Sequence, residues 1–371
     1  MNKIAIVHFQ PLEKYPPVMN VINSISRFDN THCDVFTINN SVENWFAPDK
    51  ILINRVGGAI KDNSISRYWC YIKFNVFTFI SLIIKKPNAV VAFETYSVLP
   101  IYLYKKLFFK TKVHIHYHEY TSSEEIKRSS YYFKVLHALE KKLFRTCESI
   151  SHTNEDRMQL FLKEYHFINP SKGIIAPNLP PSNWYDYAKS YKKENTTGIV
   201  RLVHVGALSM DTMHVKKMVE WVLAQKGLFT LDFYTDNSTD SVRKYIVELK
   251  SNHIQLLEGI NYYELPKILK NYDIGITLYN GYIANHVYAV PNKVMEYLAC
   301  GLRVWHSSEL ISTQKFINEN KILGCKSIDF AIVETLQTDS FEKLRTFNTN
   351  VSFETLLHAP NELVIKLTDL K

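Results

Sequence analysis

Two charged residues, Lys293 and Glu296, lie one helical turn apart in the segment VPNKVMEYLACGLRVW, residues 290–305. Pro291 favours a helix start, because the N–H group that proline lacks has no partner in a first turn. The pattern predicts a helix over residues 292–300, whose first-turn N–H groups and positive dipole end attract an anion. Lys293 adds a full charge there, which suits a phosphate. Glu296 lies on roughly the same face, where its carboxylate can accept two hydrogen bonds from the vicinal hydroxyls of a ribose.

The same spacing also fits a Lys–Glu pair on a solvated helix surface, an interaction worth only ~0.3 kcal/mol. Spacing alone leaves both interpretations open. The nucleotide interpretation needs a sheet whose edge presents this helix to a ligand, so the surrounding elements have to be considered.

Three histidines form a second polar group in the segment HIHYHEYTS, residues 114–122, at the end of an expected strand. His114, His116 and His118 alternate, so they point to one side of the strand. A metal site is not the favoured interpretation, because about 13 Å of backbone separates the outer two at ~3.3 Å per residue. Histidines satisfied within a buried core are the alternative to a functional role.

The elements that would position these residues alternate between short apolar runs and longer helical patterns. Before residue 180 the runs include KIAIVHF, CDVFTI, AVVAFE and KVHIHYH, and after residue 198 they include IVRLVHVG, FTLDFYT, DIGITLY and LRVWH. This alternation indicates βαβ units with parallel sheets. We expect an α/β fold of two doubly wound Rossmann-like domains facing a cleft, with ligands outside the carboxyl ends of the strands. The expected parts are a domain at 1–180, a linker at 181–198, a domain at 199–355 and a terminal helix at 356–371.

Composition limits the class of partner. Of 371 residues, 44 are Lys or Arg and 36 are Asp or Glu, and the formal charge of +8 favours anionic partners. We find no basic tract interleaved with aromatic residues, so a nucleic-acid partner is not expected. Five widely spaced cysteines without a C-x-x-C pair fit the reduced cytoplasm. The apolar window at 68–87 is interrupted by Lys73 and Asn75, which indicates a mostly buried helix, with contact to a membrane surface as the alternative.

Several motifs resemble those of one enzyme family in the same order along the chain. PNKVMEYLACGLRVW is similar to the P-x-K-x-x-E-Y-x-A-x-G-x-P-V signature of retaining, nucleotide-sugar-dependent glycosyltransferases of the GT-B fold, glycosyltransferase family 4. The preceding run matches the family at Glu264, Leu265 and Asp273, and LVHVGAL, residues 202–208, resembles the strand and glycine turn that open its nucleotide-binding domain. The resemblance covers residues 201–305.

The resemblance assigns roles to residues of both halves. It implies that the donor is held by the residues that match the C-terminal motifs: Gly206, Pro291, Asn292, Lys293, Glu296 and Tyr297. His118-Glu119 resembles a D-x-H-E element, which makes His118 the candidate for contact with the transferred sugar. Asn154, Glu155 and Arg157 resemble a turn near the cleft, although N-capping alone would explain the asparagine. The catalytic candidates are thus His118, Lys293 and Glu296, and the resemblance implies that no metal or other cofactor is needed.

Two positions depart from the family pattern. Tyr288 stands where many members carry an earlier glutamate, and Ala207 stands where many carry arginine. The leading expectation is a retaining glycosyltransferase of bacterial surface glycan biosynthesis. It would act on a nucleotide sugar and a glycan or lipid-linked glycan acceptor, in the cytoplasm and at the inner face of the membrane. The alternatives are an inactive GT-B partner subunit, which the two departures make conceivable, and a nucleotide-sugar epimerase or hydrolase.

Overall fold

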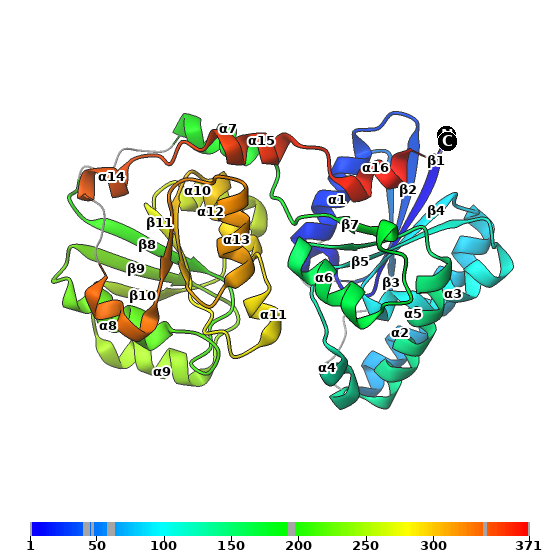
Figure 1. The fold of residues 1–371 in the computed structure, drawn as a ribbon, viewed down its shortest axis with the longest axis horizontal. Helices are drawn as coiled ribbons and strands as arrows, with labels where there is room; N and C mark the ends of the chain where they lie inside the picture. The colour runs from blue at the N-terminus through cyan, green and yellow to red at the C-terminus, as the bar shows by residue number, and fades with distance from the viewer. Residues whose placement is uncertain are drawn as a thin grey trace. The chain divides into compact units, whose positions relative to one another are not determined.

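The structure is a computed structural model, and it describes residues 2–39, 45, 48–57, 64–191, 197–336 and 340–369. The chain forms two compact units, shown in Figure 1. Unit 1 comprises Met1–Asn178 together with Pro360–Lys371, and unit 2 comprises Leu179–Ala359. Residues 360–371, at the red end of the colour bar in Figure 1, therefore belong to the same unit as the N-terminal strand.

Unit 1 is built on a parallel sheet of seven described strands in the order β3-β2-β1-β4-β5-β6-β7. Its strands are β1 (Asn2–His8), β2 (Thr31–Ile38), β3 (Ile51–Val56), β4 (Ala89–Phe93), β5 (Lys112–Tyr117), β6 (Ser149–His152) and β7 (Gly173–Ile175). Its helices are α1 (Pro16–Ser26), α2 (Ser64–Lys85), α3 (Val98–Leu107), α4 (Ser123–Arg128), α5 (Tyr131–Thr146), α6 (Glu155–Glu164) and α16 (Glu362–Thr368).

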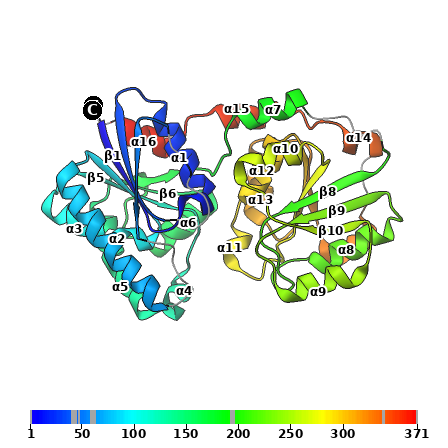
Figure 2. The ribbon, with the colours of Figure 1, turned by 180° about the vertical axis from the view of Figure 1, so that it is seen from behind.

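The central strands of unit 1 are buried on both faces, as continuous apolar runs such as AVVAF in β4 require, whereas the edge strand β3 is mostly half-buried. A core cluster that includes Val90, Ile101 and Leu136 joins the sheet to α3 and α5. α2 contacts α3, and α3 contacts α5, so these three helices lie side by side (Figures 1 and 2). Among the described residues, no helix has the length and apolar character needed to cross a membrane.

Unit 2 is built on a second parallel sheet, with six described strands in the order β10-β9-β8-β11-β12-β13. Its strands are β8 (Val200–Val205), β9 (Phe229–Tyr234), β10 (Ile254–Leu257), β11 (Ile274–Thr277), β12 (Arg303–Ser307) and β13 (Cys325–Ile328). Its helices are α7 (Asn183–Tyr191), α8 (Val215–Ala224), α9 (Asp240–Leu249), α10 (Leu265–Leu269), α11 (Ala284–Val287), α12 (Asn292–Ala299), α13 (Ile311–Glu319), α14 (Phe341–Arg345) and α15 (Val351–His358).

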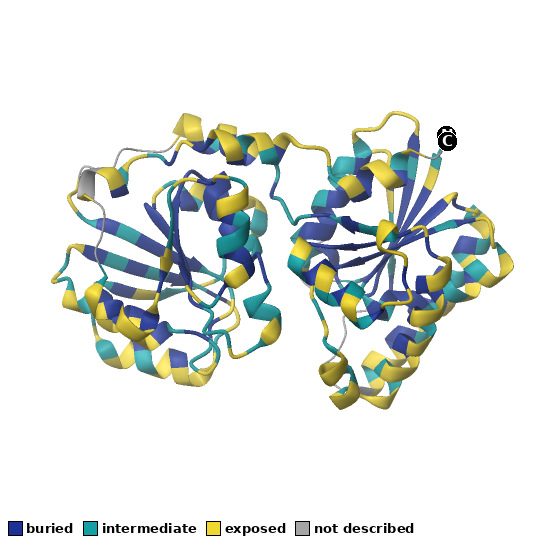
Figure 3. Ribbon diagram, in the orientation of Figure 1, coloured by how far each residue is buried: buried dark blue, intermediate teal, exposed yellow. Residues whose placement is uncertain are grey.

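The sheet of unit 2 contributes to two apolar clusters. One contains Leu202 of β8 with Met218 of α8 and Val242 of α9, and the other contains Val203 of β8 with Val294 of α12. Neighbouring residues of one strand point to opposite faces, so the sheet is covered on both sides. In Figure 3 the central strands of both sheets are mostly dark blue, whereas β9, β10 and β13 include half-buried or exposed residues. The expected α/β class with two doubly wound parallel sheets is confirmed.

Strand order reverses once in each sheet. In unit 1 the chain continues from β1 to β2 and β3 on one side, and β4 to β7 follow on the other, so the reversal lies between β1 and β4. In unit 2 it lies between β8 and β11. These two points are where ligands of open α/β sheets bind, outside the carboxyl ends of the strands.

The segments that join the units differ from the expected ones. Residues 181–198 were expected to be a linker, but Asn183–Tyr191 form α7, while residues 192–196 lie outside the described part of the chain. α7 forms because Trp184, Tyr185 and Ala188 are buried in a core of unit 2. The single terminal helix expected at 356–371 is replaced by the end of α15 and by α16, with Pro360 between them. α15 belongs to unit 2, whereas α16 belongs to unit 1.

Candidate active site

Lys293 lies at the strand-order reversal of unit 2. Its Nζ donates a hydrogen bond to the hydroxyl of Tyr279 at 3.2 Å, and Tyr279 follows β11 by two residues. Its side chain also lies against Gly206, the residue directly after β8: a Cβ placed on that glycine would come within 2.6 Å of the Lys293 Cε. The ammonium group is thus held between the carboxyl ends of β8 and β11.

Gly206 makes this approach possible for two reasons. Its φ of +114° is a conformation that other residues rarely adopt, and any side chain there would collide with Lys293. Its N–H group donates to the carbonyl of Tyr234 at 2.8 Å, which ties the turn to the neighbouring strand β9. The backbone after β8 is therefore fixed, and the missing side chain of Gly206 leaves room for the side chain of Lys293.

The N-terminus of α12 presents free amide groups beside Lys293. Pro291 is the N-cap of this eight-residue helix and provides no side-chain hydrogen bond to its first turn. The N–H groups of Asn292 and Lys293, the first two helical residues, have no acceptor within an α-helix. Together with the dipole of α12 and the Lys293 charge, they form an anion-binding arrangement.

Glu296 lies one turn further along α12 and is half-buried. Burial raises the pKa of its carboxyl to about 7, and the charge of Lys293 opposes this shift. Among the residues that the structure describes, none forms a hydrogen bond or ion pair with this carboxylate. Its oxygens are thus available as acceptors, which agrees with the predicted contact to ribose hydroxyls and disagrees with a Lys–Glu surface pair.

Tyr297 has a different place from the other residues expected at the donor site. Its side chain is fully buried, its hydroxyl accepts the Val205 N–H at 2.9 Å, and its ring fills the space beside Gly275. This side chain fixes α12 against β8 and β11. It therefore positions Lys293 and Gly206 and does not itself face a ligand.

His118 follows β5 in unit 1 and belongs to a chain of hydrogen bonds. The hydroxyl of Ser151 donates to the Ile115 carbonyl, so its oxygen accepts from Nδ1–H of His116 at 2.7 Å. The Nε2 of His116 is then an acceptor for Nδ1–H of His118 at 3.2 Å, and Asn178 Oδ1 lies 3.3 Å from the same nitrogen. These roles assign the tautomers from the network of bonds.

This series of hydrogen bonds leaves the Nε2 atom of His118 with a lone pair. This atom is buried and has no hydrogen-bond partner among the described residues. Burial, with the Arg157 charge in addition, lowers the pKa of His118 to about 4 although the Asn178 contact opposes the shift. The imidazole is therefore neutral near pH 7, and its Nε2 can accept a hydrogen bond from a hydroxyl group.

Glu94 is a candidate that the sequence did not indicate. It follows β4 directly, at the strand-order reversal of unit 1, and its Oε1 accepts the His118 backbone N–H at 2.7 Å. Its φ of +64° and ψ of 161° fall in a region that is almost restricted to glycine. Burial raises its pKa to about 8, with the nearby carboxylates of Glu119 and Glu140 adding to the shift. The sequence marks Glu94 only as the last residue of the run AVVAFE, and its place beside the strand-order reversal is a property of the folded sheet.

The remaining predicted residues of unit 1 divide into two groups. Asn154 caps α6 by accepting the Arg157 N–H at 2.9 Å, as predicted, and the Arg157 guanidinium donates to the His118 carbonyl. Glu119 and Glu155 are exposed, and Glu155 accepts a hydrogen bond from Gln159 on the surface of α6. Arg157 contacts His118 directly and Asn154 holds the backbone of Arg157, whereas Glu119 acts on Glu94 through its charge.

The three alternating histidines do not converge. His114 bonds to Ser149 at 2.8 Å, whereas His116 and His118 bond to each other. Within the described ranges, no group of three or more His, Cys, Asp or Glu residues is arranged to hold a metal ion.

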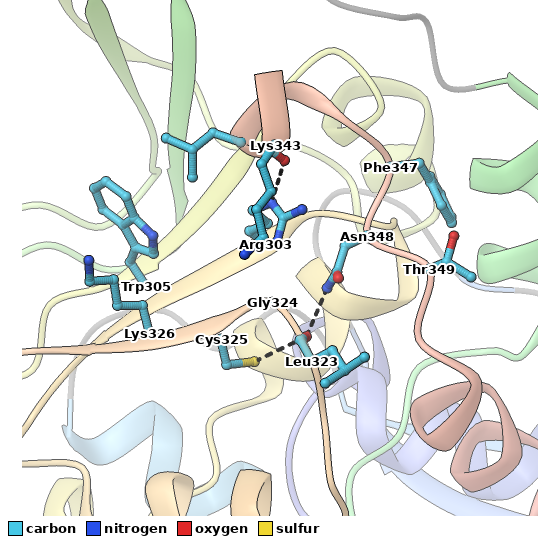
Figure 4. A pocket seen from close by; sticks show the side chains of 11 residues that line it. Arg303, Trp305, Leu323, Gly324, Cys325, Lys326, Lys343, Phe347, Asn348 and Thr349 are labelled. Carbon is cyan, nitrogen blue, oxygen red and sulfur yellow. Dashed lines mark hydrogen bonds between the residues drawn. The ribbon is translucent and has the colours of Figure 1, made fainter. Parts of the chain in front are cut away.

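Figure 4 shows a cavity of about 480 Å³ in unit 2, and Lys293 is not among the residues that line it. It is lined by Arg303, the first residue of β12, and by Cys325, the first residue of β13. Figure 4 shows Arg303 bonded to the Lys343 carbonyl beside it. This cavity is at the amino ends of the strands, so it is separate from the site at their carboxyl ends.

The comparisons with known proteins identify the fold. The sequence matches no protein-family model and no curated protein. The structure is similar to HepE from Anabaena in complex with UDP and glucose, with a TM-score of 0.63 at 11% identity over 99% of this chain and 97% of that one. The fold is GT-B. The apo lipopolysaccharide outer core galactosyltransferase WaaB has a TM-score of 0.58 at 12% identity, over 98% and 94% of the chains.

The GT-B fold does not by itself identify a reaction. UDP-GlcNAc 2-epimerase from Neisseria meningitidis, solved with UDP-GlcNAc bound, has a TM-score of 0.59 at 12% identity over 99% of each chain. A galactosyltransferase and a UDP-GlcNAc 2-epimerase thus share this fold. The choice between them depends on the side chains at the carboxyl ends of the strands.

Proposed function

We propose that this protein is a retaining glycosyltransferase that moves a sugar from a nucleoside diphosphate sugar to an acceptor hydroxyl. One observation carries the proposal: Lys293, the first-turn amides of α12 and the Gly206 turn against which the lysine packs meet at the strand-order reversal of unit 2. This arrangement suits a diphosphate. The half-buried carboxylate of Glu296, one turn along the same helix, suits the ribose hydroxyls of the same nucleotide.

The chemistry follows from where charge develops. When the bond between the sugar and the diphosphate breaks, negative charge grows on the leaving phosphate oxygens. Lys293 and the first turn of α12 would stabilise this charge, and they need little reorganisation because Tyr279 and Gly206 already hold the lysine in place. We infer that unit 2 holds the donor.

Unit 1 would serve the sugar and the acceptor. Neutral His118 offers the lone pair of Nε2 to a hydroxyl group, and Glu94 holds the backbone of His118. The resemblance of residues 290–305 to the signature of family 4 supports retention of the anomeric configuration and a reaction without a metal. The similarity to WaaB, a lipopolysaccharide outer core galactosyltransferase, supports a role in bacterial surface glycan synthesis. The five widely spaced cysteines without a C-x-x-C pair favour the cytoplasm.

The test begins with a screen of nucleotide sugars for thermal stabilisation, because a ligand that binds the folded state raises its stability by RT ln(1 + [L]/Kd). The stabilising donor is then incubated with glycan acceptors, with and without EDTA, and NMR gives the anomeric configuration of the product. A retained linkage that forms equally with EDTA is the expected result. An inverted linkage contradicts retention, and loss of rate with EDTA contradicts the metal-free reaction.

Two other results would replace the proposal. Conversion of the donor to its epimer, or its hydrolysis without an acceptor, would identify an epimerase or a hydrolase. The fold shared with UDP-GlcNAc 2-epimerase makes this the second candidate. Stabilisation by a donor without turnover across the acceptor panel would indicate a nucleotide-binding partner subunit.

A further inference from the structure

The cavity of unit 2 in Figure 4 lies at the amino ends of two strands. It is bounded by the first residues of β12 and β13, and on another side by residues 343–349, which contain the end of α14 and the segment that follows it. We call it the β12–β13 cavity. Its volume of about 480 Å³ is within the range of small-molecule sites, ~300–1,000 Å³.

Hydrogen bonds fix residues 343–349 against the two strands. The Nε of Arg303 donates to the carbonyl of Lys343 at 2.9 Å. The backbone N–H of Asn348 donates to the carbonyl of Gly301 at 3.0 Å, and its side-chain amide donates to the carbonyl of Leu323 at 3.0 Å. The β12–β13 cavity is therefore preformed, and a ligand would have to order little of it on binding.

Three cationic side chains line the β12–β13 cavity. They belong to Arg303, Lys326 and Lys343, whereas none of the described residues that line the cavity is an aspartate or a glutamate. Arg303 is buried, and its hydrogen bond to the Lys343 carbonyl orients the guanidinium group. A planar guanidinium beside lysine ammonium groups is an arrangement that matches the oxygens of a phosphate.

Polar uncharged groups lie beside these cations. In Figure 4, Asn348 and Thr349 are on one side of Arg303, and Trp305 and Lys326 are on the other. The side-chain nitrogen of Asn348 donates to two backbone carbonyls, and its Oδ1 accepts no hydrogen bond from the part of the chain that the structure describes. This oxygen and the hydroxyl of the exposed Thr349 are suitable partners for hydroxyl groups of a ligand.

The rest of the lining includes apolar side chains that a ligand ring could contact. Trp305 and Leu344 belong to a core cluster of unit 2, which explains their burial. Leu323 is 64% exposed and Phe347 is half-buried, so the core does not account fully for these two. Ligand sites commonly combine apolar walls with a few polar groups that set the orientation of the ligand.

A purely structural role explains only part of this lining. The contact between Arg303 and the Lys343 carbonyl holds α14 to β12, and this contact needs neither the charge of Lys326 nor that of Lys343. Lysines on a solvated surface are the alternative explanation for those two charges. That alternative does not explain why they line one cavity together with a buried arginine.

We propose that the β12–β13 cavity binds a small molecule that carries a phosphate group and a hydroxylated ring, as in a sugar phosphate or a nucleotide. The phosphate contacts Arg303, Lys326 and Lys343, and the hydroxyl groups bond to Asn348 and Thr349. This site is separate from the candidate active site, which lies at the carboxyl ends of the strands. The inference does not depend on the proposed activity, and its test uses no turnover.

Calorimetry of the full-length protein measures the binding of ribose 5-phosphate and AMP, with ribose and adenosine as the matched compounds without phosphate. We expect a phosphorylated probe to bind at least about tenfold more tightly than its matched compound, because the charge-assisted hydrogen bonds require the phosphate. The tighter of the two probes shows whether the ring is a sugar alone or a nucleoside. A failure of both phosphorylated probes to bind at millimolar concentration would overturn the proposal.

The double substitution of Lys326→Gln and Lys343→Gln should weaken binding of the tighter probe at least about tenfold. The double substitution of Lys216→Gln and Lys244→Gln is the matched control, because it removes the same charge from exposed positions on helices of unit 2. It should bind the probe like the wild type. Equal weakening in the two double variants would show that only net charge attracts the probe, and this would overturn the proposal. Urea unfolding confirms that each variant is folded.

The candidate active site is the competing location for a phosphorylated probe. Lys293→Met should retain binding of the probe, and loss of binding in this variant would assign the probe to the active site and overturn the proposal. Acetylation by acetic anhydride, read by mass spectrometry, gives the location directly. The probe should protect Lys326 and Lys343 and leave Lys244 unprotected. Protection of Lys293 without protection of Lys326 and Lys343 would also overturn the proposal.

Discussion

Replacement of Lys293 by methionine gives the sharpest test of the donor site. The side chain keeps its length and much of its apolar stem, and the positive charge disappears. We expect kcat to fall by at least about 100-fold, because removing one preorganised group that stabilises developing charge commonly costs ~2.7–4 kcal/mol.

The structure supports this magnitude. A unit charge pair about 4 Å apart interacts by roughly 4 kcal/mol at the effective dielectric near a protein surface. Lys293 is half-buried, and the phosphate gains only part of a charge as its bond to the sugar breaks, so the lower part of the range is appropriate.

Tyr279→Phe tests the positioning of the lysine. It removes the hydroxyl that accepts a hydrogen bond from Nζ but leaves the charge, and it should lower kcat by about tenfold or less.

The assay measures initial rates over a range of donor concentrations, with calorimetry of the nucleoside diphosphate and urea unfolding for each variant. Lys293→Met should lower kcat and weaken diphosphate binding while the free energy of unfolding stays close to that of the wild type. A Lys293→Met enzyme with wild-type kcat and intact fold would refute the assignment of Lys293 to the leaving group. An equal loss in Lys293→Met and Tyr279→Phe would show that the hydroxyl, not the charge, is what matters.

Three further changes separate binding, transfer and stability. Glu296→Gln should weaken donor binding about tenfold by calorimetry. It should not lower the free energy of unfolding of the unliganded protein, because a carboxyl whose pKa is raised in the folded state makes the protein less stable as pH rises through about 7. A large loss of stability with unchanged affinity would make Glu296 a structural residue. His118→Ala should lower transfer and leave nucleoside diphosphate affinity nearly unchanged, and loss of that affinity would move His118 into the nucleotide pocket. Burial lowers the pKa of His152 to about 3, so below pH 6.5 the unfolded state binds more protons than the folded state. The free energy of unfolding therefore decreases as the pH is lowered below 6.5. Relative to wild type, His152→Phe should therefore be about 2 kcal/mol more stable at pH 5 than at pH 8 in urea unfolding; an equal difference at both pH values would contradict this reasoning.

Local patterns in the sequence predicted the parts of the fold that depend on neighbouring residues. The helix expected at 292–300 is α12, Asn292–Ala299, and Asn154 caps α6 as its side-chain chemistry requires. Both signals act within a single turn of the chain. α7 was missed for the opposite reason: the segment from 183 to 191 has no sustained periodicity, and its helix is stabilised by Trp184 and Tyr185 in a core made by distant residues.

The histidines show how far a periodic pattern can be used. The two-residue period of a strand places His114 and His116 on one side of β5. Because β5 ends at Tyr117, the strand geometry does not set the direction of the His118 side chain. Their partners come from β6, which is adjacent only in the folded sheet. The tautomer that leaves Nε2 of His118 free depends on Ser151 of that strand, and a single-sequence pattern does not contain this information.

Glu94 illustrates a candidate site residue that depends on conformation more than on residue pattern. Its backbone conformation costs on the order of 1–3 kcal/mol for a residue other than glycine, and glycine at this position would avoid the cost. A glutamate in that place is explained by what its carboxyl does: it accepts the backbone N–H of His118 at the edge where unit 1 would meet a ligand. With a pKa of about 8, the carboxyl is largely protonated at neutral pH and holds His118 without placing a full negative charge beside it. Strain, burial and hydrogen bonding therefore identify the same residue, and each of them exists only in the folded chain.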